Sequence, residues 1–203
     1  GEVLPQNIGT MKWDGKIPFK HTEKLSIKRS DDFDEDCLAP QWQWNYQPRK
    51  DYFSLTERPG WLRLKAYRPL ETNNLLKAGN TLTQRTFRKQ NNDVTIKMDI
   101  SNMQDGQKNG LCHFSSQHSA IGIVKEEDAC YLEYRKNGNI TKGIQIHSEF
   151  VWFRTEWGMD GKSQYYYSLD GDNFLPFGEK YQLTWGNYRG DRIGIYCFND
   201  KKE

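Results

Sequence analysis

The feature that most constrains the fold is a strict alternation of apolar and polar residues, repeated in short runs through the second half of the chain. In the clearest run, Val94, Ile96, Met98 and Ile100 are separated by polar residues. A period of two places these apolar side chains on one face of a β-strand. No long run has the 3.6-residue period of an amphipathic helix. The sequence therefore predicts an all-β fold.

Further runs of the same kind are bounded by turn residues. Asn137-Gly138 is a strong hairpin signal, because two-residue turns favour residues that tolerate positive φ, and residues 158–161 form a second predicted turn. The predicted strands cover residues 92–101, 110–115, 120–125, 130–135, 139–147, 151–157, 162–169 and 191–198. Roughly a dozen short strands at such spacing favour a two-sheet antiparallel β-sandwich.

The stretch from residue 31 to residue 64 carries a more specific signature. It begins with acidic residues around Phe33, contains a tryptophan pair and turns at Pro59-Gly60. Residues 61–64 (W-L-R-L) then alternate large apolar and charged side chains, as a half-buried strand does. We expect residues 80–86 (N-T-L-T-Q-R-T) to be the partner strand.

These segments resemble the C-terminal concanavalin-A-like β-sandwich of family 43 glycoside hydrolases, the β-xylosidases and α-L-arabinofuranosidases. That domain begins with the pattern D-x-F-x-x-x-x-L-x-x-x-W-x-W-N, followed by a W/Y-L-R-L strand and by N-T-L-T-Q-R-T. The residues that match the first pattern in register are Asp31, Phe33, Leu38, Trp42, Trp44 and Asn45. The resemblance extends to about residue 200 and implies a jelly-roll or laminin-G-like sandwich.

The domain organisation follows from this resemblance. We expect residues 1–30 to be a linker with one short strand at 24–27, and residues 31–203 to be the sandwich. Family members continue into a closing D-x-D-x-F-x-Y strand, so a last strand is expected to be missing or replaced here. The chain begins at Gly1 and shows no signal peptide, which suggests a piece of a longer, periplasmic or secreted protein.

Composition excludes several classes of partner. The net charge is only +2 and both signs are interspersed, which argues against a nucleic-acid partner. No apolar run approaches the roughly 18 residues of a membrane span. The four cysteines lack metal-ligand spacing, and we expect buried free thiols rather than disulfides. No cofactor is predicted.

The acidic stretch after residue 30 raises the question of a structural calcium. Asp32, Asp34 and Asp36 occupy positions 1, 3 and 5 of an EF-hand frame, but Cys37 and Gln43 stand where that loop needs Gly and Glu. A solvated acidic turn is the default interpretation. A different calcium site, pairing Asp32 with a late acid such as Asp191, stays open as an alternative.

No catalytic residue is predicted in this chain. The resemblance implies that catalysis belongs to the carboxylates of an N-terminal five-bladed propeller, which would not fit within 203 residues. Glu126, Glu127, Asp128 and Glu133 are expected to form a solvated face. The histidines show no paired ligand spacing.

Aromatic residues are the remaining candidates for recognition, since sugars stack their C–H faces on aromatic rings. Most of them alternate within strands, so the core of the sandwich is the better interpretation for the majority. The candidates outside the 185–190 loop are Trp42, Trp44, Trp152, Trp157, Tyr165, Tyr166 and Tyr167. Residues 185–190 instead form a glycine-flanked loop. In β-xylosidases of the family, an aromatic residue of the equivalent loop reaches over the sugar pocket. The candidate carbohydrate-binding or pocket-closing residues are therefore Trp185, Tyr188 and Arg189, with a purely structural turn as the alternative.

Three functional hypotheses follow. The first is a non-catalytic accessory sandwich that braces the propeller of the same polypeptide and helps to close its pocket on a plant cell-wall oligosaccharide. The second is a self-sufficient carbohydrate-binding module, which a concave groove lined by two or more exposed aromatic rings would favour. The third is a small glycosidase, which would need a cleft with paired carboxyl groups.

Overall fold

The computed structural model describes residues 14–16, 30–86, 89–184, 186 and 190–201. The chain divides into two units, residues 1–31 and 32–203. The described residues of the first unit have no assigned helix or strand, and the strand expected at 24–27 lies outside the described residues. All of the elements below belong to the second unit.

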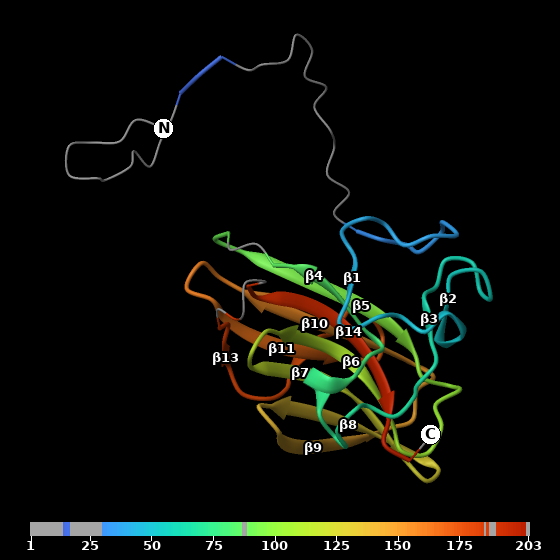
Figure 1. The fold of residues 1–203 in the computed structure, drawn as a ribbon. Coiled ribbons are helices and arrows are strands. Elements are labelled where there is room, and N and C mark those ends of the chain that lie inside the picture. Colours follow the sequence, from blue (N-terminus) through green and yellow to red (C-terminus); the bar gives the residue numbers. More distant parts are fainter. Residues whose placement is uncertain (1–13, 17–29, 87–88, 185, 187–189, 202–203) are drawn as a thin grey trace. The chain divides into compact units, whose positions relative to one another are not determined.

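The larger sheet is antiparallel and, within the described residues, has seven strands in the order β1-β4-β14-β6-β7-β8-β9 (Figure 1). Its first and last strands in the chain are far apart in sequence but lie two places apart in the sheet. The strands are β1 (Gln43–Trp44), β4 (Thr81–Arg85), β6 (Gln107–Phe114), β7 (His118–Glu126), β8 (Ala129–Lys136), β9 (Asn139–Ile146) and β14 (Arg192–Asn199).

The smaller sheet has the order β12-β11-β10-β5, and β13 also pairs with β11. Its strands are β5 (Asn92–Asp99), β10 (Phe150–Trp157), β11 (Lys162–Ser168), β12 (Leu175–Pro176) and β13 (Tyr181–Gln182). A separate ribbon pairs β2 (Phe53–Ser54) with β3 (Arg63–Leu64). The helical elements described are two 3-10 turns, η1 (Lys50–Tyr52) and η2 (Leu75–Lys77).

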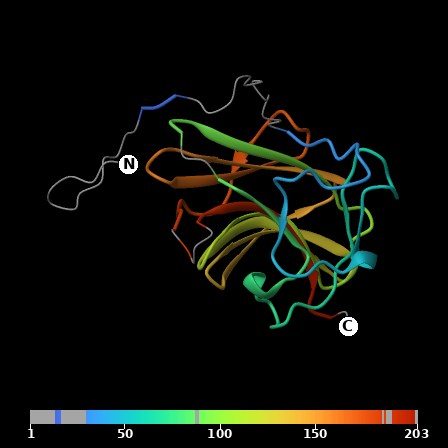
Figure 2. The same ribbon diagram turned by 45° about the horizontal axis from the view of Figure 1, so that its top comes forward.

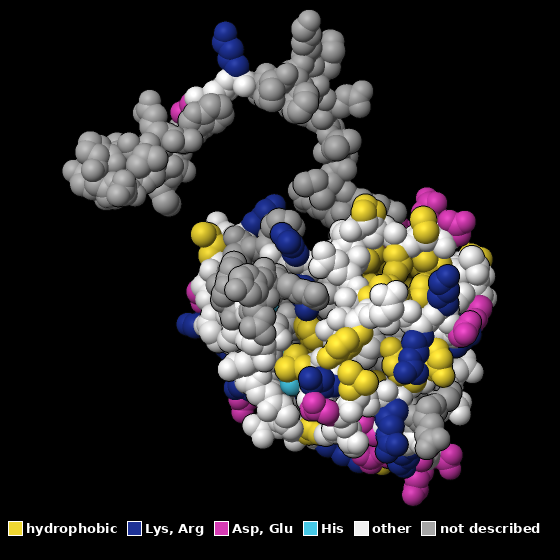
Figure 3. Space-filling view, in the orientation of Figure 1, with side chains coloured by type: hydrophobic (Ala, Val, Ile, Leu, Met, Phe, Trp, Pro, Cys, Tyr) yellow, Lys and Arg dark blue, Asp and Glu magenta, His cyan; other side chains and the backbone are white. Residues whose placement is uncertain are grey.

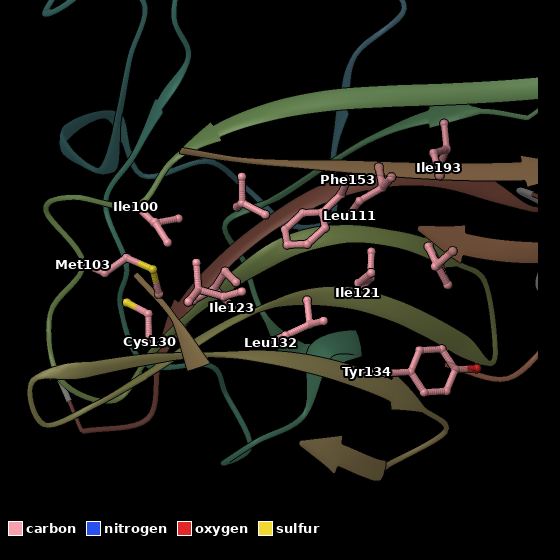
Figure 4. Close-up of a cluster of buried hydrophobic side chains, with 13 residues drawn as sticks. Ile100, Met103, Leu111, Ile121, Ile123, Cys130, Leu132, Tyr134, Phe153 and Ile193 are labelled. Carbon is pink, nitrogen blue, oxygen red and sulfur yellow. The ribbon is translucent and has the colours of Figure 1, made fainter. Parts of the chain in front are cut away.

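The core lies between the two sheets, which Figure 2 shows as stacked layers. Val151 and Phe153 of β10 are completely buried and pack with Leu111, Ile121 and Leu132 of the larger sheet (Figure 4). Burial alternates along β10, because successive side chains of a strand point to opposite faces. The predicted all-β sandwich of concanavalin-A-like type is confirmed.

A second cluster covers part of the outer face of the larger sheet. Leu75 of η2 is completely buried and packs against residues of three neighbouring strands. Those residues are Cys112, Phe114, Ala120, Tyr196 and Phe198. The segment that leads into β4 therefore covers part of a sheet face that would otherwise be exposed, as Figure 1 shows for η2 in front of β6 and β7.

Both predicted hairpins are confirmed. Asn137 and Gly138 have φ values of 49° and 90°, the left-handed backbone that a type I′ turn requires between β8 and β9. Strands β10 and β11 pair in register across residues 158–161. The four cysteines are free thiols, and Cys37 is the exposed one while the others are buried.

One predicted pairing is wrong. Residues 61–64 do not pair with residues 80–86, because Leu64 lies opposite Phe53 of β2, while β4 lies between β1 and β14. The alternation shows that each segment is a strand, but it carries no information about which strand is the neighbour. The two-residue strands β1, β2, β3, β12 and β13 are also too short to produce an alternating pattern by themselves.

Candidate functional site

The loop between β13 and β14 contains all three predicted site residues. Trp185, Tyr188 and Arg189 lie outside the described residues, so their side chains are not placed. The described residues on either side of them, however, show how the two ends of this loop are held.

The first end is attached to the neighbouring 115–117 loop. The Thr184 and Ser115 hydroxyl oxygens are 2.8 Å apart and share a hydrogen bond. Gly186 is buried against Ser116, since a Cβ atom on it would lie 2.5 Å from the Ser116 backbone nitrogen. Only glycine fits such a close approach. Gly190, with φ of 66°, donates its N–H to the Gly186 carbonyl at 3.1 Å.

The second end is attached to β4. The Asp191 carbonyl accepts hydrogen bonds from the Thr86 backbone N–H at 3.3 Å and from its hydroxyl at 3.0 Å. The next residue, Arg192, is buried and donates from Nη1 to the Thr83 hydroxyl at 3.0 Å. Its guanidinium lies 5.0 Å from the Phe114 ring centre. The loop therefore begins and ends on a rigid base.

The four carboxylates expected on a solvated face differ in their exposure to solvent. Glu126, Glu127 and Asp128 are exposed, as expected, and Glu126 forms a surface ion pair with Lys142 at 2.5 Å. Glu133 is only 5% exposed and accepts a hydrogen bond from Arg135. The prediction is therefore wrong for Glu133, because alternation gave its face of the strand but not the segment that covers that face.

The aromatic residues divide between the core and the outer face of the smaller sheet. Trp157 and Tyr165 are buried, as expected. Trp152 and Tyr166 are half-buried on the outer face, where the Lys97 ammonium lies 5.0 Å from the centre of the Trp152 ring. Adding a Cβ atom to Gly171 would bring it within 3.0 Å of this indole. Trp152 is therefore not a core residue.

The turn that contains Gly171 has a structural role. Asp170 accepts hydrogen bonds from the Ser168 hydroxyl at 2.7 Å, from the Asp172 and Asn173 N–H groups and from the Asn173 side chain. The Asn173 side-chain bond, followed by the backbone donors, holds the pKa of Asp170 well below its ordinary value. All of these donors lie within three residues, so the carboxylate stabilises its own turn.

Neither metal ligands nor a membrane span emerge from the described part of the chain. No group of three or more His, Cys, Asp or Glu side chains gathers there in a way that could hold a metal ion. The described residues also include no helix that is long and apolar enough to cross a membrane.

The comparison with known sequences decides the family. The model of the β-xylosidase C-terminal concanavalin A-like domain matches residues 30–203. The chain belongs to this family. A β-xylosidase of Formosa agariphila is 34% identical over 208 residues, which cover 93% of this chain and 35% of that protein. The resemblance read from residues 31–64 is thereby confirmed.

Solved structures of the family have the same fold. A bifunctional family 43 enzyme of Bacteroides eggerthii superimposes with a TM-score of 0.76 at 28% identity, over 85% of this chain and 24% of that one. A family 43 protein of Bacillus licheniformis gives a TM-score of 0.71 at 23% identity, over 87% and 37% respectively, and supports the fold alone. The chain spans 35% and 32% of the two curated relatives that it matches. The domain is the C-terminal part of larger family 43 proteins.

Proposed function

We propose that this domain is a non-catalytic accessory sandwich of a family 43 hydrolase that acts on xylan- or arabinan-type polysaccharide in the periplasm or outside the cell. In this role it braces an N-terminal catalytic propeller and helps to close the propeller's sugar pocket with Tyr188. The observation that carries the proposal is the way in which the loop around Tyr188 is attached at its two ends.

The attachment supports a positioning role. Thr184 and Gly186 are held against the 115–117 loop, and Asp191 is held by Thr86. A loop that contributes to another domain's pocket must be held within a fraction of an ångström to be useful, and attached ends limit the conformations of the residues between them. Loops on a rigid sandwich commonly carry function in this way.

The state of the carboxylates supports the non-catalytic part of the proposal. An inverting or retaining glycosidase needs two carboxyl groups that face each other across the scissile bond. Glu133 and Glu126 are instead bound to Arg135 and Lys142, and Asp200 is bound to Lys108. Each of these three carboxylates is thus neutralised by a cation rather than paired with a second acid.

The first experiment tests catalysis directly. The isolated 203-residue chain is assayed with aryl β-xylosides and aryl α-L-arabinofuranosides. We expect no turnover. Turnover that persists through purification and is lost in a Glu133→Gln or Glu126→Gln variant would contradict the proposal.

The second experiment tests pocket closure in the longer polypeptide that carries the propeller. Tyr188→Ala should lower kcat/KM by about tenfold through lost substrate positioning. Tyr166→Ala, on the outer face of the smaller sheet, is the matched control and should leave kinetics unchanged. In the isolated domain Tyr188→Ala should change the unfolding free energy by less than about 1 kcal/mol. A loss of about 3 kcal/mol or more would mark Tyr188 as a packing residue.

A further inference from the structure

A groove of about 880 Å³ lies on the outer face of the larger sheet, and Asn73, just before η2, forms part of its lining. Val124 of β7 and Tyr131 and Glu133 of β8 line it, together with Lys108 of β6 and Lys142 of β9. In the sheet, Lys108 lies opposite Val124, which lies opposite Tyr131. The groove therefore crosses several strands rather than running along one turn. Nothing in the sequence predicted it, because its lining residues come from distant segments.

Its wall contains a connected network of polar side chains. The Arg135 guanidinium donates from Nε to Glu133, and from Nη1 to the backbone and side-chain oxygens of Asn73 at 3.3 and 2.8 Å. Asn73 in turn donates its N–H to Asp200 at 2.7 Å, and Asp200 is paired with Lys108. Four of these five residues line the groove, and the network joins segments that are up to 127 residues apart.

Asn73 has a backbone conformation that is uncommon for residues other than glycine. Its φ of 59° lies in the left-handed region, which asparagine tolerates better than most residues. The bonds to Asp200 and Arg135 hold it there. Such conformations persist only where the surroundings fix them, and they occur often at binding sites.

One donor of the network is left over. The Nη2 group of Arg135 is buried and has no hydrogen-bond partner within the described part of the chain. Arg135 is 2% exposed and does not itself line the groove, so its contribution is to hold Glu133 and Asn73, which do.

The opposite side of the groove offers an apolar surface. The Lys142 ammonium lies 3.6 Å from the centre of the Tyr131 ring and is paired with the exposed Glu126. The exposed Ile140 adds aliphatic surface, whereas Val124 is buried at the base of the groove. An exposed ion pair is a weak interaction, so Lys142 can move aside and free the ring for another group.

The charges of the lining residues are nearly balanced. The lining contains four lysines and five carboxylates. The lysines are Lys108, Lys125, Lys142 and Lys201, and the carboxylates are those of Glu126, Glu127, Asp128, Glu133 and Asp200. Figure 3 shows both signs interspersed at the lower right of this face, near the end of the chain. A surface with alternating donors and acceptors and little net charge suits a neutral, hydroxyl-rich ligand better than a polyanion or a polycation.

We propose that this groove binds a neutral oligosaccharide, with one sugar ring on Tyr131 and its hydroxyl groups bonded to Asn73 and Glu133, which Arg135 holds in place. The proposal does not depend on Tyr188, which belongs to another loop. It makes the domain a glycan-binding module in its own right, in addition to the accessory role proposed above. The choice of xylo-oligosaccharide as the first probe rests on that proposed function.

The test is a titration of the 203-residue chain with xylohexaose and with cellohexaose. Binding is monitored by amide NMR chemical shifts and by calorimetry. We expect shifts that centre on Gly106, Val124 and Tyr131, with a Kd at or below the millimolar range. Tyr131→Ala and Asn73→Gly should each weaken binding by about tenfold. Asn73→Gly keeps the backbone conformation while removing the side-chain oxygen that meets Arg135, so it tests the network if Tyr131→Ala fails to fold.

The matched control is Tyr166→Ala, which removes a half-buried tyrosine from the opposite side of the sandwich and should leave the affinity unchanged. An oligogalacturonate should bind at least about tenfold more weakly than the neutral sugars, because carboxylates outnumber lysines in the groove. Absence of shifts with neutral sugars at about 10 mM, or shifts that map to the outer face around Trp152, would overturn the proposal.

The two proposals fail separately. Loss of glycan binding in the groove, with a tenfold kinetic effect of Tyr188→Ala in the longer polypeptide, would remove the groove proposal alone. Binding in the groove with unchanged kinetics of Tyr188→Ala would instead remove pocket closure and leave a carbohydrate-binding module.

Discussion

The Tyr165 hydroxyl in β11 accepts a hydrogen bond from the His113 backbone N–H in β6 at 2.9 Å, and this bond joins the two sheets inside the core. The same hydroxyl donates to the Ser119 carbonyl at 2.8 Å. A second bridge, 2.8 Å long, connects the His113 Nε2 atom to the Thr155 hydroxyl of β10. All four residues are buried. Because these bonds are directional, they fix how one sheet lies over the other, which apolar packing alone does less strictly.

The Tyr165→Phe substitution should therefore destabilise the domain. It keeps the ring but leaves the His113 N–H and the Ser119 carbonyl without the hydroxyl, so we expect a loss of about 2 kcal/mol in the free energy of unfolding. Urea unfolding, monitored by fluorescence, measures this free energy. Tyr166→Phe, one residue along on the outer face, should cost less than about 0.5 kcal/mol. Equal effects of the two substitutions would show that the sheets are not joined through Tyr165.

The domain should lose stability as the pH falls below 6.5. Burial lowers the pKa of His113 to about 3 and the pKa of His118 to about 4, with repulsion from Arg135 adding to the second. The unfolded chain takes up protons below pH 6.5 that the folded chain cannot bind, so unfolding becomes easier. Each histidine should cost about 1.4 kcal/mol per pH unit between 6.5 and its folded pKa.

The His118→Leu variant isolates this effect. Relative to the unsubstituted domain, it should lose about 2 kcal/mol less stability between pH 6.5 and pH 5, measured by urea unfolding at both values. A slope that does not change in the His118→Leu variant would contradict the assignment.

Gly122 should not tolerate a side chain. A Cβ atom there would lie 2.0 Å from the Asn109 carbonyl oxygen and 2.4 Å from the Tyr196 hydroxyl, and the first of these is backbone that cannot move without disturbing β6. Gly122→Ala should cost about 3 kcal/mol or more. Gly158→Ala is the control, since its nearest neighbour is the Asp160 side chain at 3.3 Å, and its cost should stay below about 1 kcal/mol.

The cysteines should react in two classes. Cys37 is exposed, whereas burial raises the pKa of Cys112 to about 12 and also raises that of Cys130. In the native domain at pH 8 a thiol reagent should label Cys37 rapidly and the other three only on unfolding. All four should react in denaturant without reductant. Cys37→Ser should abolish the rapid phase, and a rapid phase that survives would show that a buried thiol is accessible.

Part of this fold could be predicted from the sequence, because strands and tight turns depend on the side chains and backbone preferences of neighbouring residues. The alternation of Val94, Ile96 and Met98 gave both the strand and its inward face, and all three pack against the core. Asn137-Gly138 gave the hairpin, because few other residue pairs adopt two successive positive φ values. The family pattern between residues 31 and 45 gave the sandwich type.

The neighbours of each strand, and what covers each face, were decided only by the tertiary structure. Trp152 and Trp157 lie on the same strand, five residues apart, so the period of two puts them on opposite faces without saying which face is inside. Glu133 is buried because residues around Asn73, sixty positions earlier in the chain, fold over it. The amino-acid sequence by itself determined the strands, the turns and the family, since these depend on neighbouring residues. Strand order and the groove with its polar network depend on contacts between distant segments, which no local pattern encodes.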